Sequence, residues 1–482
     1  MVLRPRTQRQ TAAEPMPDQT QIPPPEPTTF LQNAIPHATK TRWMVLLLIS
    51  VMYMITYMDR TGLSIAAPFM AREFGFSETT IGVVFSVFLW AYAIGQIPAG
   101  WFADRVGPRL VLLIIVPFWS IMTMVTAIAR GLVSLGVIRF VFGLAEAGAF
   151  PAATRGMQLW FPGSERGIVH GVTHSFSRFA IAIVPFVAVS IVGAFGWRWI
   201  FYLFGASGLL WSFVFYAFYR NLPEEHPNVN QAELGYIRGR YPDGTIKPAY
   251  DPLRQPKPPW KIIFRSANMW YIAAGYCCFY YGTYFYVTWF PTYLLEYRHL
   301  SLKVMGTLAS LPLLAGMAGD ILGGTLTDSI YRKTGKLKFA RRIVAAPAML
   351  ASGTFLIPAA LTHNAVTAIF CLTGSLFFLE LVISPAWAVP MDVGGEYSGT
   401  VSGVMNMAGS LAASVSPIIF GFLVQRGLWT APFFISAGVL LTGALIWAFL
   451  IDPEKSVVED MIKGGRAYGN APNGRHLCEP RN

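Results

Sequence analysis

The sequence predicts an all-α integral membrane protein in which twelve transmembrane helices form two bundles of six. Of its 482 residues, 54% are hydrophobic and 13% are charged, about half the charged fraction of soluble domains. Apolar segments long enough to cross a bilayer recur twelve times. The longest polar interruption separates the sixth segment from the seventh. This composition excludes an ordinary soluble globular protein, which could not bury so much apolar surface.

The twelve segments follow one another with short polar connections, and none resembles a cleaved signal peptide because the first begins only at Trp43. The predicted spans are 43–67, 81–103, 110–129, 133–158, 167–195, 197–219, 267–294, 302–326, 343–361, 364–390, 397–425 and 429–451.

These spans divide the chain into five parts. Residues 1–42 form a polar, proline-rich tail that is predicted to be disordered. Residues 43–219 and 267–451 form the two bundles. Residues 220–266 form a basic central loop, and residues 452–482 form a second tail.

The cations predict the orientation, because Lys and Arg accumulate in cytoplasmic loops. With both termini cytoplasmic, the inner loops hold most cations, including Arg105, Arg155, Arg166 and a run from Arg332 to Arg342. This asymmetry accounts for the net charge of +12 without nucleic-acid binding. The expected location is the inner (plasma) membrane.

A motif recurs at corresponding places in the two halves. The segment Gly100-Trp-Phe-Ala-Asp104-Arg105 follows the second span, and Gly324-Thr-Leu-Thr-Asp328 follows the eighth. Glycine permits close helix packing, and the aspartate can pair with a cation or a helix end. Corresponding motifs in two six-helix halves are typical of repeat-built transporters.

The segment from Gly100 to Arg109 resembles the signature loop of the major facilitator superfamily. Further segments resemble its anion:cation symporter family, across roughly residues 43–455. They are Arg139-Phe140 with Gly143–Gly148 and Phe150–Ala152, Trp160–Pro162 with Glu165–Gly167, Gly196–Phe201, Leu222–Pro227, Thr288–Pro291, Trp387–Asp392, and Gly399–Gly403 through Asn406.

The resemblance implies the major facilitator fold and proton-coupled uptake of an organic anion, such as the hexonates, hexuronates or aldarates of bacterial sugar-acid carriers. The alternatives are a carrier for an aromatic, dicarboxylic or sulfonated acid, or a membrane ligand sensor without transport. The expected partners are the anion, protons and the lipid bilayer, for a protein that functions as a monomer. No cofactor, metal site or enzymatic activity is expected, because the chain shows no ligand-spaced cluster or nucleophile.

Ionisable groups within the apolar spans are the candidate functional residues, because they are costly to bury there. Arg60 is predicted to bind the substrate carboxylate through two hydrogen bonds. Tyr57 lies on the same helical face, and Tyr92 is assigned to the same pocket. The alternative is that Arg60 extends its side chain to the outer membrane surface.

Asp59, Arg139 and Glu146 are predicted to couple proton movement to transport. Arg139 and Glu146 are two helical turns apart on one face, and Glu146 has no cation next to it in the sequence. A desolvated carboxyl group can bind a proton near neutral pH. The resemblance implies the same coupling role for these three residues. The alternative is a fixed ion-pair network that holds helices together.

Arg178 is an additional cation of the fifth span, with His174 one turn before it. Two interpretations remain open. Arg178 could bind a second carboxylate of the substrate, or it could pair with Glu380 or Asp59. The sequence assigns no role to Asp320.

The second half contributes aromatic and polar candidates for the pocket. Tyr284 and Asn406 could bind hydroxyl groups, and Trp387 could form an apolar wall. The resemblance supports Ser384, Trp387 and Asn406 as binding residues. It departs at Tyr280 and Thr283, where sugar-acid carriers have Asn and Gln, so a more aromatic pocket is expected.

The last group is predicted to form conformational latches at cytoplasmic helix ends. Breaking such contacts would shift the balance between inward-facing and outward-facing states. The residues are Gly100, Asp104, Arg105, Arg109, Asp328 and Asp392.

Overall fold

A computed structural model describes residues 38–76, 78–241, 243–247, 259–300 and 302–458. Over these ranges the regular structure is helical, apart from a single antiparallel bridge between Arg240 and Ile246. Residues 1–37 of the tail predicted to be disordered lie outside the described residues, whereas residues 41 and 42 of that tail belong to the first helix. Residues 459–482 of the second tail also lie outside the described residues.

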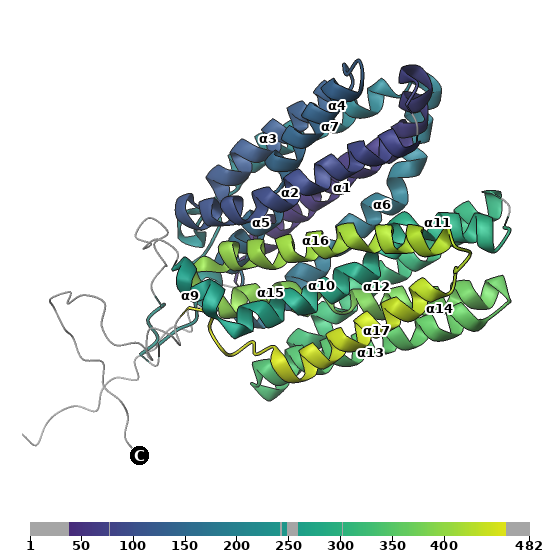
Figure 1. Ribbon diagram of the computed structural model, residues 1–482. Helices are drawn as coiled ribbons and strands as arrows, with labels where there is room; N and C mark the ends of the chain where they lie inside the picture. The colour runs from purple at the N-terminus through teal and green to yellow at the C-terminus, as the bar shows by residue number, and fades with distance from the viewer. Residues whose placement is uncertain (1–37, 77, 242, 248–258, 301, 459–482) are drawn as a thin grey trace, which may run out of the picture.

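The helices form two bundles that lie side by side (Figure 1). The first contains α1 (Thr41–Phe74), α2 (Glu78–Val106), α3 (Pro108–Thr126), α4 (Leu132–Glu146), α5 (Ala149–Trp160), α6 (Arg166–Phe195) and α7 (Arg198–Phe218). The second contains α10 (Ala267–Thr288), α11 (Phe290–Thr292), α12 (Leu302–Thr334), α13 (Leu337–Leu361), α14 (Ala365–Glu380), α15 (Ile383–Val393), α16 (Ser398–Val424) and α17 (Ala431–Leu445).

Ten helical stretches in the described residues are long and apolar enough to cross a membrane. The ten include α4 with α5 and α14 with α15 as single spans. Two further long helices, α10 with 22 residues and α12 with 33 residues, occupy the seventh and eighth places in the order. At about 1.5 Å per residue, both are long enough for a hydrocarbon core of about 30 Å. The count of twelve crossings therefore stays a prediction at these two places.

Two predicted spans are each broken into two helices at the same kind of position. Glu146 ends α4 and Glu380 ends α14, and each is followed five residues later by a proline, Pro151 or Pro385. A proline removes the hydrogen bond to the carbonyl four residues before it and clashes with that carbonyl. The same sequence spacing therefore breaks the fourth span of each half directly after a glutamate.

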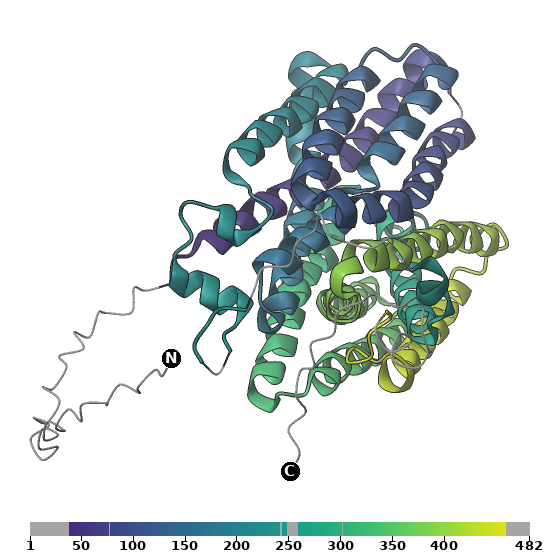
Figure 2. The same ribbon diagram turned by 90° about the vertical axis from the view of Figure 1, so that its left-hand side faces the viewer.

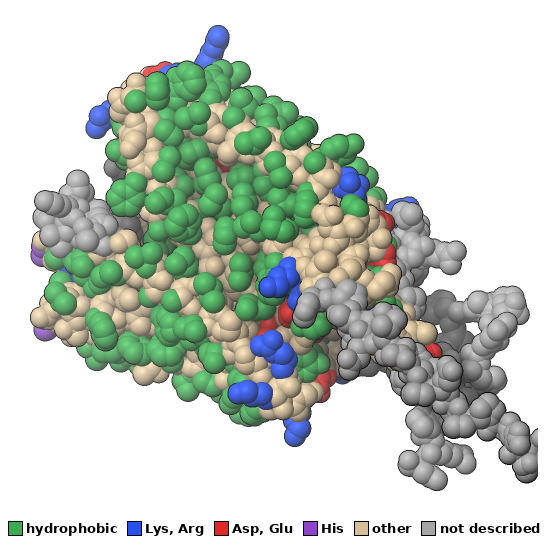
Figure 3. All heavy atoms as spheres, turned by 180° about the vertical axis from the view of Figure 1, so that it is seen from behind, with side chains coloured by type: hydrophobic (Ala, Val, Ile, Leu, Met, Phe, Trp, Pro, Cys, Tyr) green, Lys and Arg blue, Asp and Glu red, His purple; other side chains and the backbone are tan. Residues whose placement is uncertain are grey.

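The outer surface of the bundles is apolar, as Figure 3 shows for one face. Large side chains there are largely exposed, for example Phe186 and Phe213 in the first bundle and Phe370 and Ile418 in the second. Such a surface suits contact with lipid tails and would be unstable in water.

The central segment is more ordered than a simple loop. Residues 231–238 form α8 (Gln231–Arg238), and residues 260–265 form α9 (Trp260–Arg265). The fully buried Glu233 of α8 accepts hydrogen bonds from the backbone N–H groups of Thr41 and Arg42. These bonds attach α8 to the beginning of α1. Residues 248–258 lie outside the described residues.

The bundles meet at the end of the molecule where the described chain begins and ends, which we call the terminal end. Figures 1 and 2 show the bundles from the side and from this end, and they diverge toward the opposite end. Glycines allow the close approach, since a Cβ atom at Gly100 would collide with the backbone of Gly399, and one at Gly324 with that of Gly167. These contacts pair α2 with α16 and α12 with α6.

Glycine also sets the packing inside the first bundle, which gives a direct test. A Cβ atom at Gly205 would lie 2.6 Å from the carbonyl oxygen of Ser120, whereas nothing lies within 4 Å of one at Gly136. We expect Gly205→Ala to destabilise the protein by about 1–3 kcal/mol through overpacking. The matched control Gly136→Ala should be neutral or slightly stabilising because Ala favours helix. Thermal unfolding of both detergent-solubilised variants measures this, and equal unfolding temperatures would contradict the packing.

Candidate functional site

Arg60 lies in the middle of α1 and forms an ion pair within the first bundle. Its Nε donates to Oε1 of Glu146 at 3.0 Å, and the glutamate side chain is fully buried. Because α1 continues to Phe74, Arg60 is far from the helix end. This position does not support the alternative in which Arg60 extends to the outer surface. Its side chain keeps 18% of its surface exposed, so it is accessible from one side.

Aromatic rings surround the Arg60 guanidinium. Its carbon lies 4.5 Å from the ring centre of Tyr92, 5.1 Å from Phe88, 5.2 Å from Tyr57 and 5.8 Å from Phe150. Ring faces attract a cation without neutralising its charge. The rings therefore orient Arg60 and leave it able to bind an anion. Phe88 and Phe150 were missed as site residues, because an isolated phenylalanine in an apolar span gives no signal of its own.

Glu146 has no cation next to it in the sequence, but in three dimensions the Arg60 side chain lies beside it. Arg60 is 86 positions away in the chain and reaches Glu146 only because α1 packs against the break between α4 and α5. Arg139 has no carboxylate within 4.0 Å in the described part of the chain. Its guanidinium lies over the rings of Phe142 and Phe88, at 4.3 and 4.9 Å.

Asp59 is buried beside this pair, near the side chains of Thr123 and Trp119 of α3. It is 2% exposed, and neither of its carboxylate oxygens accepts a hydrogen bond within the described structure. Asp59 interacts electrostatically with Glu146 and Arg139. The three residues predicted to couple protons are therefore close together, although their role stays a prediction.

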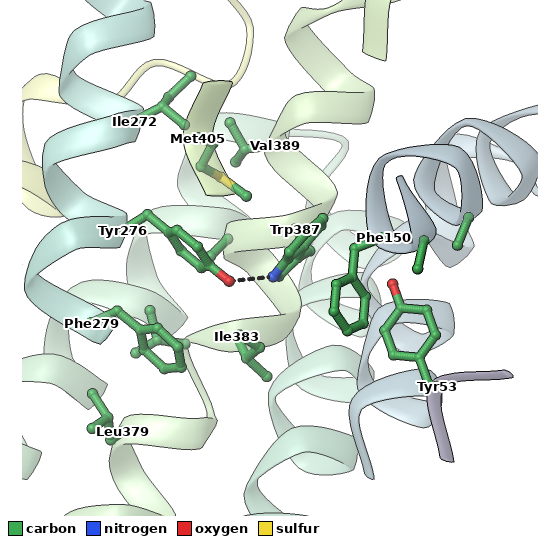
Figure 4. Close-up of a cluster of buried hydrophobic side chains, with 14 of the residues drawn as sticks. Tyr53, Phe150, Ile272, Tyr276, Phe279, Leu379, Ile383, Trp387, Val389 and Met405 are labelled. Atoms are coloured by element: carbon green, nitrogen blue, oxygen red, sulfur yellow. Dashed lines mark hydrogen bonds between the residues drawn. The ribbon is translucent and has the colours of Figure 1, made fainter. Parts of the chain in front are cut away.

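The second bundle contributes Trp387, which lies between the two bundles. Figure 4 shows Tyr276 on one side of this indole and Phe150 and Tyr53 on the other. Trp387 Nε1 donates to the hydroxyl of Tyr276 at 2.8 Å, and its ring centre lies 5.9 Å from that of Phe150. Tyr276 is a neighbour that the sequence did not single out. Trp387 is 1% exposed and already satisfied, so it forms a wall rather than a free hydrogen-bond donor.

The other polar candidates of the second bundle differ in whether their polar atoms already have hydrogen-bond partners within the protein. Ser384 Oγ donates to the backbone oxygen of Asp320 at 2.6 Å and is fully buried. Asn406 Nδ2 donates to the Tyr92 hydroxyl at 3.3 Å across the bundle interface, and Asn406 Oδ1 has no donor within the described structure. Tyr284 is half-buried and interacts electrostatically with Arg60 and Tyr57.

Arg178 forms a second buried ion pair, and this one joins the bundles. Its Nη2 lies 2.6 Å from Oε1 of Glu380, so the pairing alternative holds in this conformation. Arg178 belongs to α6 of the first bundle and Glu380 ends α14 of the second. One turn before Arg178, His174 packs against Trp387 with ring centres 5.5 Å apart.

At the terminal end, Asp104 of α2 caps the first turn of α16. Its carboxylate accepts from the backbone N–H groups of Gly399 and Thr400, at 2.9 and 2.6 Å, and from the Thr400 hydroxyl at 2.7 Å. A carboxylate at a helix N-terminus satisfies free N–H groups and the positive end of the helix dipole.

Asp328 of α12 makes the corresponding contact with the first turn of α6. It accepts from the N–H groups of Gly167 and Ile168, at 3.1 and 2.7 Å. Arg341 binds both Asp328 and Asp392, at 2.8 and 3.1 Å, and Arg166 binds Asp392 at 2.8 Å. The bridging role of Arg341 was missed, because it stands within a run of surface cations in the sequence.

Arg105 and Arg109 do not join the bundles in this structure. Arg105 is exposed and lies over the ring of Trp101, its own neighbour on α2. Arg109 donates to the backbone oxygen of Tyr216 in the same bundle. The prediction of a latch is therefore unsupported for these two residues, because these contacts lie within the first bundle.

No group of three His, Cys, Asp or Glu side chains that could hold a metal ion occurs in the described part of the chain. The available chemistry is that of buried ion pairs, helix caps and aromatic walls between two bundles.

Comparison with known proteins identifies the architecture. The sequence profile of the Major Facilitator Superfamily matches residues 49–417. The chain belongs to this superfamily. A solved structure of a proton:xylose symporter of the superfamily shares the fold with a TM-score of 0.69, at 12% identity, over 87% of this chain and 98% of that one. The family assignment makes this protein a multi-pass transporter of the inner membrane and not an enzyme.

Two bacterial relatives of this superfamily member align along nearly their whole length. A probable sulfoacetate transporter of Cupriavidus necator is 40% identical over 90% of this chain and 99% of its own. A probable galactarate/D-glucarate transporter of Bacillus subtilis is 32% identical over 87% of this chain and 94% of its own.

The cap at Asp104 gives a testable prediction about the conformational balance. We expect Asp104→Ala to weaken the α2–α16 contact by about 1–2 kcal/mol, which is roughly a five- to thirty-fold shift toward opening at the terminal end. Labelling of a cysteine introduced at the buried Ser402, in a variant without native cysteines, measures that opening. Arg105→Ala is the matched control and should leave labelling unchanged. Equal labelling in the two variants would show that Asp104 does not hold this end closed.

Proposed function

We propose that the protein carries a small organic anion with two acidic groups into the cell, together with protons, and that a sulfonated carboxylic acid is its preferred substrate. The observation that carries this proposal is Arg60, a partly exposed cation within an aromatic cage in the middle of α1. The proposal includes twelve crossings, cytoplasmic termini and a monomeric carrier.

Arg60 is suited to bind one acidic group of the substrate. A guanidinium stays charged and offers two parallel N–H donors to a carboxylate or sulfonate. Its Nε is engaged by Glu146, but Nη2 has no partner within the described structure. An incoming anion can approach the exposed part of the guanidinium and compete with Glu146 for the rest of the group.

The pocket walls favour a compact substrate with few hydroxyl groups. The side-chain donors of Ser384 and Trp387 are already used within the protein, and Tyr57, Tyr280 and Tyr284 are half-buried aromatic side chains. A polyhydroxylated chain would leave several hydroxyl groups without partners, which costs free energy on binding. The sulfoacetate transporter of Cupriavidus necator, at 40% identity, supports the same substrate class.

A sugar acid is the second candidate. The unpartnered Oδ1 of Asn406 offers an acceptor for a substrate hydroxyl, and the Bacillus subtilis relative is named for galactarate and D-glucarate. The two candidates differ in how many hydroxyl groups the pocket must satisfy.

Uptake measurements on the purified full-length protein in liposomes test the substrate proposal. Labelled sulfoacetate, glucarate, galactonate and an aromatic acid are compared under an inward proton gradient. We expect sulfoacetate to accumulate most, because its two anionic groups are compact and carry no hydroxyl group. Preferential accumulation of glucarate or galactonate would favour the second candidate, and failure of all four under every gradient would exclude proton-coupled organic-anion transport.

Glu146 is proposed to bind the coupled proton when the substrate displaces it from Arg60. The amide in Glu146→Gln mimics the protonated side chain but cannot gain or lose a proton. We expect this variant to keep counterflow exchange of substrate and to lose at least about tenfold in accumulation driven by one pH unit. Glu73→Gln, which neutralises an exposed partner of Arg198, is the matched control and should accumulate normally. Normal accumulation by Glu146→Gln would remove Glu146 from the coupling role.

A further inference from the structure

A second pair of acids lies buried in the other bundle, at a site that the mechanism above does not use. Asp320 of α12 and Glu380 of α14 are both fully buried. Oε1 of Glu380 accepts from Arg178 at 2.6 Å, whereas Oε2 has no donor within the described structure. Neither oxygen of Asp320 receives a hydrogen bond from an N–H or hydroxyl group there. The Arg178 guanidinium therefore binds Glu380 directly and interacts with Asp320 only electrostatically.

The charges of this cluster balance only if it also holds a proton. Asp320 and Glu380 interact with each other directly and with Arg178. The other titratable groups that face the cluster are Tyr286 of α10, on the Glu380 side, and Tyr57 of α1 with His174 of α6, on the Arg178 side. None of these supplies a second fixed positive charge. Two adjacent buried carboxylates beside a single cation repel each other, which favours the state in which one of them keeps a proton.

The cluster repeats the arrangement around Glu146. Each glutamate is the last residue before a helix break, and each has a proline five positions later. Each is bound by an arginine from another helix and has an aspartate, Asp59 or Asp320, as an electrostatic neighbour. The second bundle therefore repeats the arrangement of groups on which the chemistry proposed for the first bundle depends.

The position of Arg178 connects this proton to the movement of the bundles. The two acids belong to the second bundle, whereas Arg178 projects from α6 of the first. The backbones of α6 and α12 are in contact next to this pair, since a Cβ atom at Gly171 would collide with the carbonyl group of Asp320. Because Arg178 projects from the opposite bundle, a relative movement of the bundles changes its distance from the two acids and therefore their affinity for protons.

We propose that Asp320 and Glu380 form a second proton-binding site that exchanges a proton in each transport cycle. This inference rests on the proposed proton-coupled function and raises the number of protons carried with each substrate by one.

Infrared absorption and transport together test the second site. In the purified protein at neutral pH, we expect a band of a buried protonated carboxyl group that disappears in Asp320→Asn. The amide in this variant reproduces the neutral form of the acid, so the fold should be retained. In liposomes with one pH unit of gradient and no membrane potential, sulfoacetate accumulation should fall about tenfold, because each coupled proton multiplies the equilibrium ratio tenfold.

Glu380→Gln should behave as Asp320→Asn does. Asp452→Asn is the matched control, because Asp452 follows the last membrane span and pairs with Lys338, and it should change neither the band nor the accumulation.

An unchanged accumulation ratio in Asp320→Asn, with normal counterflow exchange, would overturn the proposal even if the band is lost. Absence of the band in the unaltered protein would overturn it directly. Failure of the unaltered protein to accumulate any substrate under a pH gradient would instead overturn proton coupling itself, and the second site with it.

Discussion

The ion pair between Arg60 and Glu146 is the interaction on which the proposed mechanism depends. Within a bilayer, an unpaired charge costs several kcal/mol, and removal of one partner from a buried pair costs about 3–5 kcal/mol. A substrate anion can take Arg60 only if Glu146 is neutralised by another group. A proton is the smallest such group and needs no space. Anion binding and proton binding are therefore linked, because Glu146 would otherwise be left as an unpaired buried charge.

The bundle interface is built so that it can separate. At the terminal end the two bundles are joined by reciprocal caps, in which Asp104 binds the first turn of α16 and Asp328 binds the first turn of α6. The helices cross at glycines such as Gly100 and Gly324, which bring backbones together without interlocking side chains. Such contacts can break as units, and a carrier that alternates between two openings requires this property.

Much of the fold was predictable from composition and from the repeated motif, because apolar segments of sufficient length have few stable structures other than membrane helices. The location of the chemistry near Arg60 and Glu146 was also predictable, since an ionisable residue in an apolar span is rare. Their pairing was not, because it depends on how α1 packs against the break after α4. The same holds for Arg341, whose neighbours in the sequence are surface cations. The Glu-to-Pro spacing was visible at Glu146 and again at Glu380, but only the structure relates it to paired helix breaks.

The two arginine–glutamate pairs respond to different events because they connect different parts of the fold. Arg60 and Glu146 both belong to the first bundle, so a rigid-body movement of the bundles leaves their pair intact and only a competing anion separates them. Arg178 and Glu380 belong to different bundles, so the same movement separates them without any anion. In the proposed cycle, Glu146 therefore loses its arginine when substrate binds, and Glu380 loses its arginine when the conformation changes.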